Sequence, residues 1–193
     1  MSDQHIRLRA AEHRDASAVA AIYAPTVRET AISFETDPPS PDTMAARIEN
    51  TLKLYPWLVA VYADKVLGYS YAGEHSQRAA YRWSVDVTVY VAASAQGRGI
   101  GRKLYGALTG ILRAQGFRSA FAGITLPNDA SVRLHEAAGF KTLGIYKDVG
   151  FKLGEWRDVG WWRFALTENS DPPAEPIPFA EFCLTPEFAA ILG

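Results

Sequence analysis

Alternating apolar and polar residues predict an ordered series of strands and helices in the first third of the chain. Residues 5–10 alternate as a half-buried strand does. Residues 15–23 carry apolar side chains at helical spacing, and Asp15 is a suitable N-cap for that helix. After a proline-rich connection, Ser40 and Pro41 match the cap and first position of a second helix.

The middle of the chain has the pattern of a hairpin followed by a longer strand. Residues 57–63 and 66–73 form the two apolar arms, with Asp64 and Lys65 expected in the turn. Residues 83–91 alternate strictly and are expected to form a strand with two different faces. Apolar residues occupy one face, and the other face carries Ser84, Asp86, Thr88 and Tyr90.

Two more helices and three more strands are expected in the remainder of the domain. One helix is predicted over residues 100–115. Another is capped by Asn128 or Asp129 and closed by Gly139. The strands are expected at residues 118–125, 140–149 and 159–166. The order β-α-α-β-β-β-α-β-α-β-β predicts an α+β fold of three layers, a mixed sheet with helices on both faces.

The last part of the chain differs in composition from the rest. We expect residues 1–167 to form one domain and residues 168–193 to form a proline-rich extension. The apolar end of this extension is expected to dock on the body of the protein or on a second subunit.

Composition narrows the classes of function. The chain has 193 residues, of which 48% are hydrophobic and 12% aromatic, so general disorder is excluded. A net charge of −1 gives no support for nucleic-acid or membrane binding, and no apolar run reaches the ~20 residues of a membrane span. We expect no signal peptide, because the first residues are polar. The single cysteine, Cys183, fits a reducing cytoplasm, and the scattered histidines predict no metal site.

A glycine-rich segment, residues 96–101, stands between the predicted strand at 83–91 and the predicted helix at 100–115. Such a turn leaves backbone N–H groups unpaired at the positive end of a helix dipole, which suits a pyrophosphate. It has neither the Gly-Lys-Ser/Thr of a P-loop nor the position of a dinucleotide fingerprint. The alternative is an ordinary strand–helix loop with structural glycines.

Taken together, three motifs resemble the GCN5-related N-acetyltransferase (GNAT) superfamily. They are residues 87–91, residues 96–101, and Asn128 followed by residues 134–140. Within the superfamily, the chain is similar to the phosphinothricin acetyltransferase group at residues 81–91, 126–136 and 150–159. The resemblance covers about residues 5–166 and implies a mixed, mostly antiparallel, twisted sheet.

The resemblance implies acetyl-CoA as cosubstrate and no metal. Backbone groups of the strand would pair with the pantetheine arm, the glycine-rich turn would hold the pyrophosphate, and an asparagine amide would hold the far side of the arm. The expected cofactor-binding residues are Val89, Tyr90, Val91, Gly97, Arg98, Gly99, Ile100, Gly101, Arg102 and Asn128. A plain helix cap is the alternative role for Asn128, and the two roles are compatible.

Asp86 aligns with the catalytic carboxylate of the family and is expected to be the general base, directly or through water. The group usually carries glutamate there, and the shorter aspartate favours a relaying water. The alternatives are an exposed strand carboxylate or an anchor for the ammonium. A backbone N–H near Val89 or Tyr90 is expected to stabilise the oxyanion. His135 is expected to protonate the leaving thiolate, unless it only caps or packs on its helix.

The implied acceptor is a small amino-acid-like amine such as phosphinothricin, methionine sulfone or methionine sulfoximine. Glu35, Arg78, Tyr81 and Lys152 are expected to bind it, each with a solvated or structural role as the alternative. Two rival functions are acetylation of a peptide or protein N-terminus, and acyl-CoA binding without catalysis. The resemblance also implies a homodimer.

Overall fold

In the computed structural model, which describes residues 6–168 and 171–193, one seven-stranded sheet organises the chain. His5, the first residue of the first predicted strand, lies outside the described residues. The strands follow the order β1-β2-β3-β4-β5-β7-β6, and all neighbours are antiparallel except β4 and β5. The predicted α+β class with a mixed sheet is confirmed. The strands are β1 (Arg7–Ala10), β2 (Trp57–Tyr62), β3 (Lys65–Glu74), β4 (Ser84–Val91), β5 (Ser119–Leu126), β6 (Lys141–Lys152) and β7 (Glu155–Ala165).

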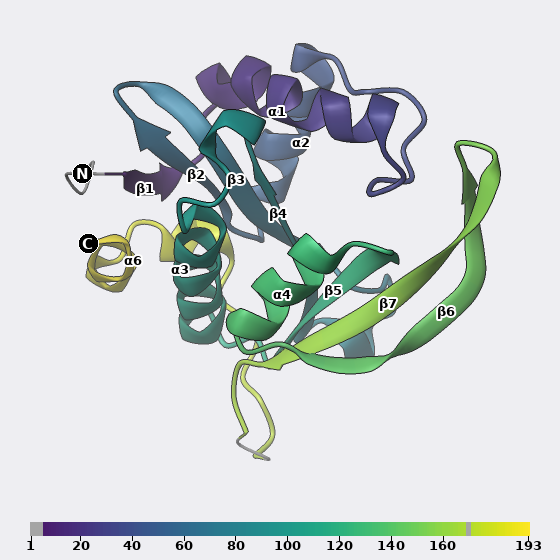
Figure 1. The fold of residues 1–193 in the computed structure, drawn as a ribbon. Coiled ribbons are helices and arrows are strands. Elements are labelled where there is room, and N and C mark those ends of the chain that lie inside the picture. Colours follow the sequence, from purple (N-terminus) through teal and green to yellow (C-terminus); the bar gives the residue numbers. More distant parts are fainter. Residues whose placement is uncertain (1–5, 169–170) are drawn as a thin grey trace.

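Helices cover both faces of the sheet (Figure 1). α1 and α2 lie on one face, and α3 and α4 lie on the other. No helix in the described part of the chain is long and apolar enough to cross a membrane. The helices are α1 (Ala16–Glu29), α2 (Pro41–Thr51), α3 (Ile100–Ala114), α4 (Asp129–Ala137), α5 (Phe179–Phe182) and α6 (Pro186–Leu192), and single 3-10 turns occur at η1 (His13–Asp15), η2 (Ala79–Tyr81) and η3 (Ala93–Ala95).

Local signals explain where the first two helices begin. Ser40 Oγ accepts a hydrogen bond from the Thr43 amide, and Pro41 occupies the first helical position, as predicted. Asp15 stands at the N-cap position of α1, but its side chain caps nothing there. Its carboxylate instead accepts from both Arg9 terminal nitrogens, at 2.6 and 2.7 Å, and from the Glu12 amide. The ion pair with β1 has taken the place of the expected cap.

β4 has two different faces, as the sequence predicts, and the structure shows that a separate hydrophobic core lies against each face. Val85 and Val87 are buried against α3, where Leu104 and Leu108 are fully buried. Tyr90 points to the opposite face and packs in the second core beneath α1 and α2. β4 is therefore covered by helices on both sides, and its position is fixed by packing.

Two strand predictions need correction. The β2–β3 turn is formed by Ala63 and Asp64, one residue earlier than expected, and both have positive φ (45° and 61°). Positive φ at both central residues is typical of the tight hairpin turns that match strand twist. β6 and β7 are also longer than predicted, because they continue as a hairpin arm to a turn near Gly154 (Figure 1).

The C-terminal extension docks on the body of the same chain. Phe179 and Phe182 are buried in the core formed by α3, and the Phe188 ring packs against both of them. The Gln115 side chain donates to the Ile177 carbonyl at 2.7 Å. The two short helices therefore complete the α3 core.

Lys152 fastens the hairpin arm to the loop between α1 and α2. Its ammonium is buried and donates to the carbonyl oxygens of Val27 (2.7 Å), Ser33 (2.6 Å) and Glu35 (2.8 Å). The Phe34 ring occupies the space that a side chain at Gly150 would fill. The arm and the loop thus form one packed unit.

Replacing Lys152 by methionine should destabilise the chain. The change leaves three carbonyls without their shared donor, and we expect the free energy of unfolding to fall by about 3 kcal/mol. Denaturant unfolding measures it, and Lys141→Met is the control, because Lys141 is exposed on the same strand. Equal midpoints for both variants would contradict a fastening role.

Candidate active site

β4 and β5 separate immediately after Asp86. Three residue pairs join the strands, ending with Asp86 opposite Phe121. Beyond that pair β4 remains bonded to β3, and β5 remains bonded to β7. In the part of the chain that the structure describes, no strand pairs with the open edge of β4 after this point. The diverging strands line a cleft, to which residues 87–90 and 123–125 contribute. Open peptide groups in such a cleft can bind an extended, peptide-like ligand.

The start of α3 lies at the end of β4 and has no side-chain cap. Gly99 is the N-cap residue, with φ 74°, and Gly97 has φ 72°. A Cβ on either glycine would meet no atom within 4 Å, so the backbone borders open space. The first N–H groups of α3 have no intrahelical acceptor, and the N-cap residue Gly99 supplies no side-chain acceptor, so these groups can bind an anion.

Of the predicted cofactor residues, Val89, Tyr90 and Asn128 line the β4–β5 cleft, Val91 lines a neighbouring cavity, and residues 97–102 lie at the start of α3, where Ile100 and Gly101 are buried. Asn128 Oδ1 accepts from the Ser131 amide at 3.2 Å, so the predicted cap is present. The cap uses the oxygen of the side chain and leaves its NH₂ group as a donor beside the cleft, which Asn128 lines. Both roles considered for this residue are sterically compatible.

His135 is buried, and both of its ring nitrogens have partners. Nδ1 lies 2.7 Å from the Ser131 carbonyl, and Nε2 lies 2.7 Å from the Tyr105 hydroxyl. Burial lowers the pKa of His135, which favours the neutral ring. The neutral ring has one N–H, and the Ser131 carbonyl accepts it. This geometry supports packing on the helix over donation to a thiolate.

The Asp86 carboxylate has one close partner that the sequence did not suggest. Asp86 Oδ1 lies 2.6 Å from His75 Nδ1, just beyond the end of β3. Burial raises the pKa of Asp86, and the hydrogen bond from His75 opposes that effect. A carboxylate with a raised pKa is a stronger base, so the predicted proton acceptor stands in suitable surroundings.

Two of the predicted substrate residues lie near this carboxylate, and two lie near the α1–α2 loop. The Tyr81 ring centroid is 5.9 Å from that of His75, and Arg78 begins the same short turn, η2. Glu35 accepts from Arg47 at 2.7 and 3.0 Å and from the Tyr23 hydroxyl at 3.0 Å. An ammonium would have to share Glu35 with Arg47. The three carbonyl bonds of Lys152 favour the structural alternative for that residue.

Comparison with known proteins agrees with this geometry. The family described as Acetyltransferase (GNAT) domain matches residues 8–161, which is most of the chain. The chain belongs to the GNAT acetyltransferase family.

Curated relatives and a solved structure narrow the group within the GNAT family. The chain is 40% identical over 173 residues to phosphinothricin N-acetyltransferase of Streptomyces viridochromogenes, covering 90% of this chain and 92% of the relative. It is 34% identical to the L-methionine sulfoximine/L-methionine sulfone acetyltransferase of Salmonella typhimurium, covering 86% and 98%. The phosphinothricin acetyltransferase of Sinorhizobium meliloti, solved with AcCoA, superposes with a TM-score of 0.84 at 35% identity, covering 89% and 95%. The predicted family and group are confirmed.

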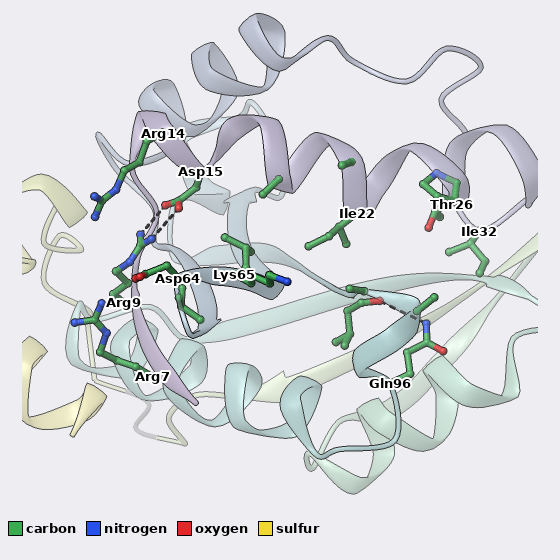
Figure 2. A pocket seen from close by; sticks show the side chains of 18 of the residues that line it. Arg7, Arg9, Arg14, Asp15, Ile22, Thr26, Ile32, Asp64, Lys65 and Gln96 are labelled. Carbon is green, nitrogen blue, oxygen red and sulfur yellow. Dashed lines mark hydrogen bonds and ion pairs between the residues drawn. The ribbon is translucent and has the colours of Figure 1, made fainter. Parts of the chain in front are cut away.

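A wider cavity of the GNAT domain, about 890 Å³, lies between α1 and the β2–β3 hairpin (Figure 2). Arg9 and Asp15 pair with each other at one end, and Gln96 donates to the Val91 carbonyl at the other. Neither Asp86 nor Asn128 lines it. Ile32 is common to this cavity and the β4–β5 cleft, so the two spaces adjoin without sharing the candidate chemical groups.

Residues 6–168 and 171–193 hold no set of three or more histidine, cysteine, aspartate or glutamate side chains that could bind a metal ion.

Sequence reasoning missed several residues of the GNAT site. His75 belongs to a loop without periodicity, and its contact with Asp86 depends on the β3–β4 register, in which Gly73 opposes Asp86. That register, if predicted, would have placed the histidine beside the carboxylate. The other residues missed are Arg47, which pairs with Glu35, Tyr105, which bonds to His135, and Phe121, which opposes Asp86.

Proposed function

We propose that the chain transfers an acetyl group from acetyl-CoA to the amine of a small amino-acid-like substrate, of the phosphinothricin, methionine sulfone or methionine sulfoximine type. The observation that carries the proposal is the open edge of β4 beyond Asp86, which continues into the uncapped start of α3. The names of the relatives at 34–40% identity support the choice of substrate class.

The residues of the cleft fit acetyl-CoA. Backbone groups of Val89, Tyr90 and Val91 would hold the pantetheine arm, and the Asn128 amide would hold its far side. The N–H groups of residues 97–102 would hold the pyrophosphate, and the Arg98 and Arg102 guanidinium groups add positive charge. When bound, acetyl-CoA supplies an acetyl group activated as a thioester.

The remaining chemistry belongs to side chains and backbone of this protein. An amine arrives as an ammonium at neutral pH, and its deprotonation depends on Asp86. A backbone N–H of Val89 or Tyr90 stabilises negative charge that develops on the acetyl oxygen. His135 holds the Tyr105 hydroxyl in place at the floor of the cleft.

The fastened α1–α2 loop favours a small acceptor over a peptide. A peptide needs an open groove, whereas Lys152 and Phe34 tie this loop to the hairpin arm beside Glu35. We propose Arg78 and Tyr81 for the acid or polar end of the substrate and Glu35 for its ammonium, and Arg47 is a cation that already pairs with Glu35. We give Lys152 only the structural role of holding the α1–α2 loop beside the site.

Release of free CoA, measured with a panel of amines, tests this function. We expect turnover with amino-acid analogues and none with peptides. The absence of turnover with every amine would instead indicate a module that binds acyl-CoA without catalysis. Asp86→Ala should lower turnover by about 10²-fold with acetyl-CoA affinity nearly unchanged, because deprotonation of the ammonium depends on this carboxylate. Asp42→Ala, an exposed change on α2, is the control. Wild-type turnover in Asp86→Ala would remove Asp86 from the mechanism.

We further propose that two copies associate through the hairpin arm. β6 is an edge strand of the sheet, and its arm exposes a continuous set of large apolar side chains. An exposed apolar patch on an open edge is typical of an interface. These side chains are between 48% and 62% exposed: Leu143, Ile145, Tyr146, Val149, Phe151, Leu153 and Trp156.

Analytical ultracentrifugation tests the homodimer. The wild type should sediment at twice the 21.2 kDa chain mass, and Trp156→Glu should sediment as a monomer, because a buried charge opposes the contact. Leu184→Glu, which changes an exposed leucine away from the arm, is the matched control and should remain dimeric. A monomeric wild type would contradict the proposal.

Two broader assignments complete the proposed function. Residues 1–167 form the acetyltransferase domain and residues 168–193 form an extension that supports α3. A cytoplasmic location is supported by composition, since Cys183 is the one cysteine of the chain.

A further inference from the structure

His75 adjoins the Asp86 carboxylate at the point where β4 and β5 separate. The 2.6 Å distance between His75 Nδ1 and Asp86 Oδ1 is that of a strong hydrogen bond. An ionised carboxylate accepts hydrogen bonds and donates none, so Nδ1 carries the hydrogen and Nε2 of the neutral ring keeps its lone pair. The carboxylate thereby selects the tautomer, as an acidic residue does when it orients a basic imidazole.

Aromatic side chains also hold the His75 ring in place. The ring stacks on Phe121, with centroids 4.4 Å apart, and Trp161 meets it at nearly a right angle, 6.3 Å away. Phe121 opposes Asp86 in the last β4–β5 pair, so the two side chains project from the same sheet face. The imidazole is therefore held beside Asp86, at the point where β4 and β5 separate.

A cavity of about 240 Å³ gives access to this ring. Its lining residues are His75, Phe121, Leu143, Gly144, Tyr146 and Trp161. A Cβ at Gly123 would lie 3.4 Å from the Trp161 ring, and Gly123 itself lines the β4–β5 cleft. Gly123 in the wall of the cleft therefore lies against Trp161 in the wall of the cavity. Aromatic faces attract an ammonium, so a substrate amine suits this position.

We propose that His75 Nε2 accepts the proton of the substrate ammonium and that Asp86 positions the imidazole for that step. The inference rests on the proposed acetyltransferase function and names the group that removes the proton. It replaces the relaying water expected from the short aspartate side chain. Asp86 acts through His75 in this scheme and is a positioning residue.

The protons and electron pairs of this reaction balance. The ammonium gives one proton to His75 Nε2, which later releases it to solvent. The free amine nitrogen bonds to the acetyl carbon, and the carbon–sulfur bond breaks with its electron pair on sulfur. The nitrogen loses its second proton, and the sulfur gains one. The products are the amide, the free thiol and one proton in solution.

The charged and titratable groups around His75 come from several elements of the fold. Among the described residues, Asp86 is the charged group within ion-pair distance, and Tyr81 is the titratable group in ring contact. β5 and β6 present Phe121 and Tyr146 to the cavity beside this ring, and β7 presents Trp161. Arg163 of β7 stands opposite Phe121 and donates to Ser119 Oγ.

Steady-state kinetics with an amine that the wild type acetylates test the dyad. His75→Gln keeps a donor for Asp86 but has no basic nitrogen, and His75→Phe keeps the stack on Phe121. Both should lower kcat by about 10²-fold, with acetyl-CoA affinity within about twofold of wild type. The acid limb of kcat/KM should move to lower pH in His75→Gln, since a carboxylate then remains as the base. His13→Gln, an exposed histidine remote from the cleft, is the control.

A double variant separates concerted from independent action. Asp86→Ala combined with His75→Gln should be no slower than the slower single variant, because the two residues act as a unit. Wild-type kcat in His75→Gln, or an unmoved acid limb, would overturn the dyad. A loss of stability with normal kcat in the folded protein would assign His75 a structural role and overturn it too. A wild type active on the panel while these results fail would leave the proposed function standing and reject the dyad alone.

Discussion

The interrupted ladder between β4 and β5 is the constraint on which the rest of the site depends. A continuous sheet would pair every backbone group of β4 and leave no room for a ligand between the strands. Here the pairing stops after Asp86 and Phe121, and β4 is held from then on by β3 and by helices on both faces. The strand can keep one open edge because its side chains pack against two separate cores.

Several contacts keep this opening in shape. The bond between His135 and Tyr105 fixes α4 against α3 on one side of the cleft. On the other side, Lys152 and Phe34 join the α1–α2 loop to the hairpin arm. The C-terminal helices pack on the outer side of α3, so they support the helix whose start faces the cleft. The whole chain therefore contributes to one opening at the centre of the sheet.

Much of the fold could be predicted from local patterns. Strict alternation located β4, and the Ser40-Pro41 signal located the start of α2, because each depends on neighbouring residues alone. The Asp15 cap failed because Arg9, which belongs to another element, competes for the carboxylate. The hairpin arm was predicted too short, since its exposed apolar residues follow no burial pattern.

The backbone groups of the candidate site could be predicted from the sequence, but its side chains could be predicted only in part. The glycine-rich turn and Asn128 carry recognisable motifs, so their places on the cleft followed from the sequence. His75, Phe121 and Trp161 carry none, and they meet only through the register of three different strands. The partners of Lys152 and His135 likewise come from distant segments, so their buried bonds could not be foreseen from spacing.

Hydrogen exchange followed residue by residue by NMR, with and without acetyl-CoA, tests the central claim most directly. Bound acetyl-CoA should slow exchange at the amides that open α3, Ile100 and Gly101, and at amides on the open edge of β4 beyond Val87, while β6 is unaffected. Slowed exchange at other segments, with these amides unchanged, would contradict the account of the cleft.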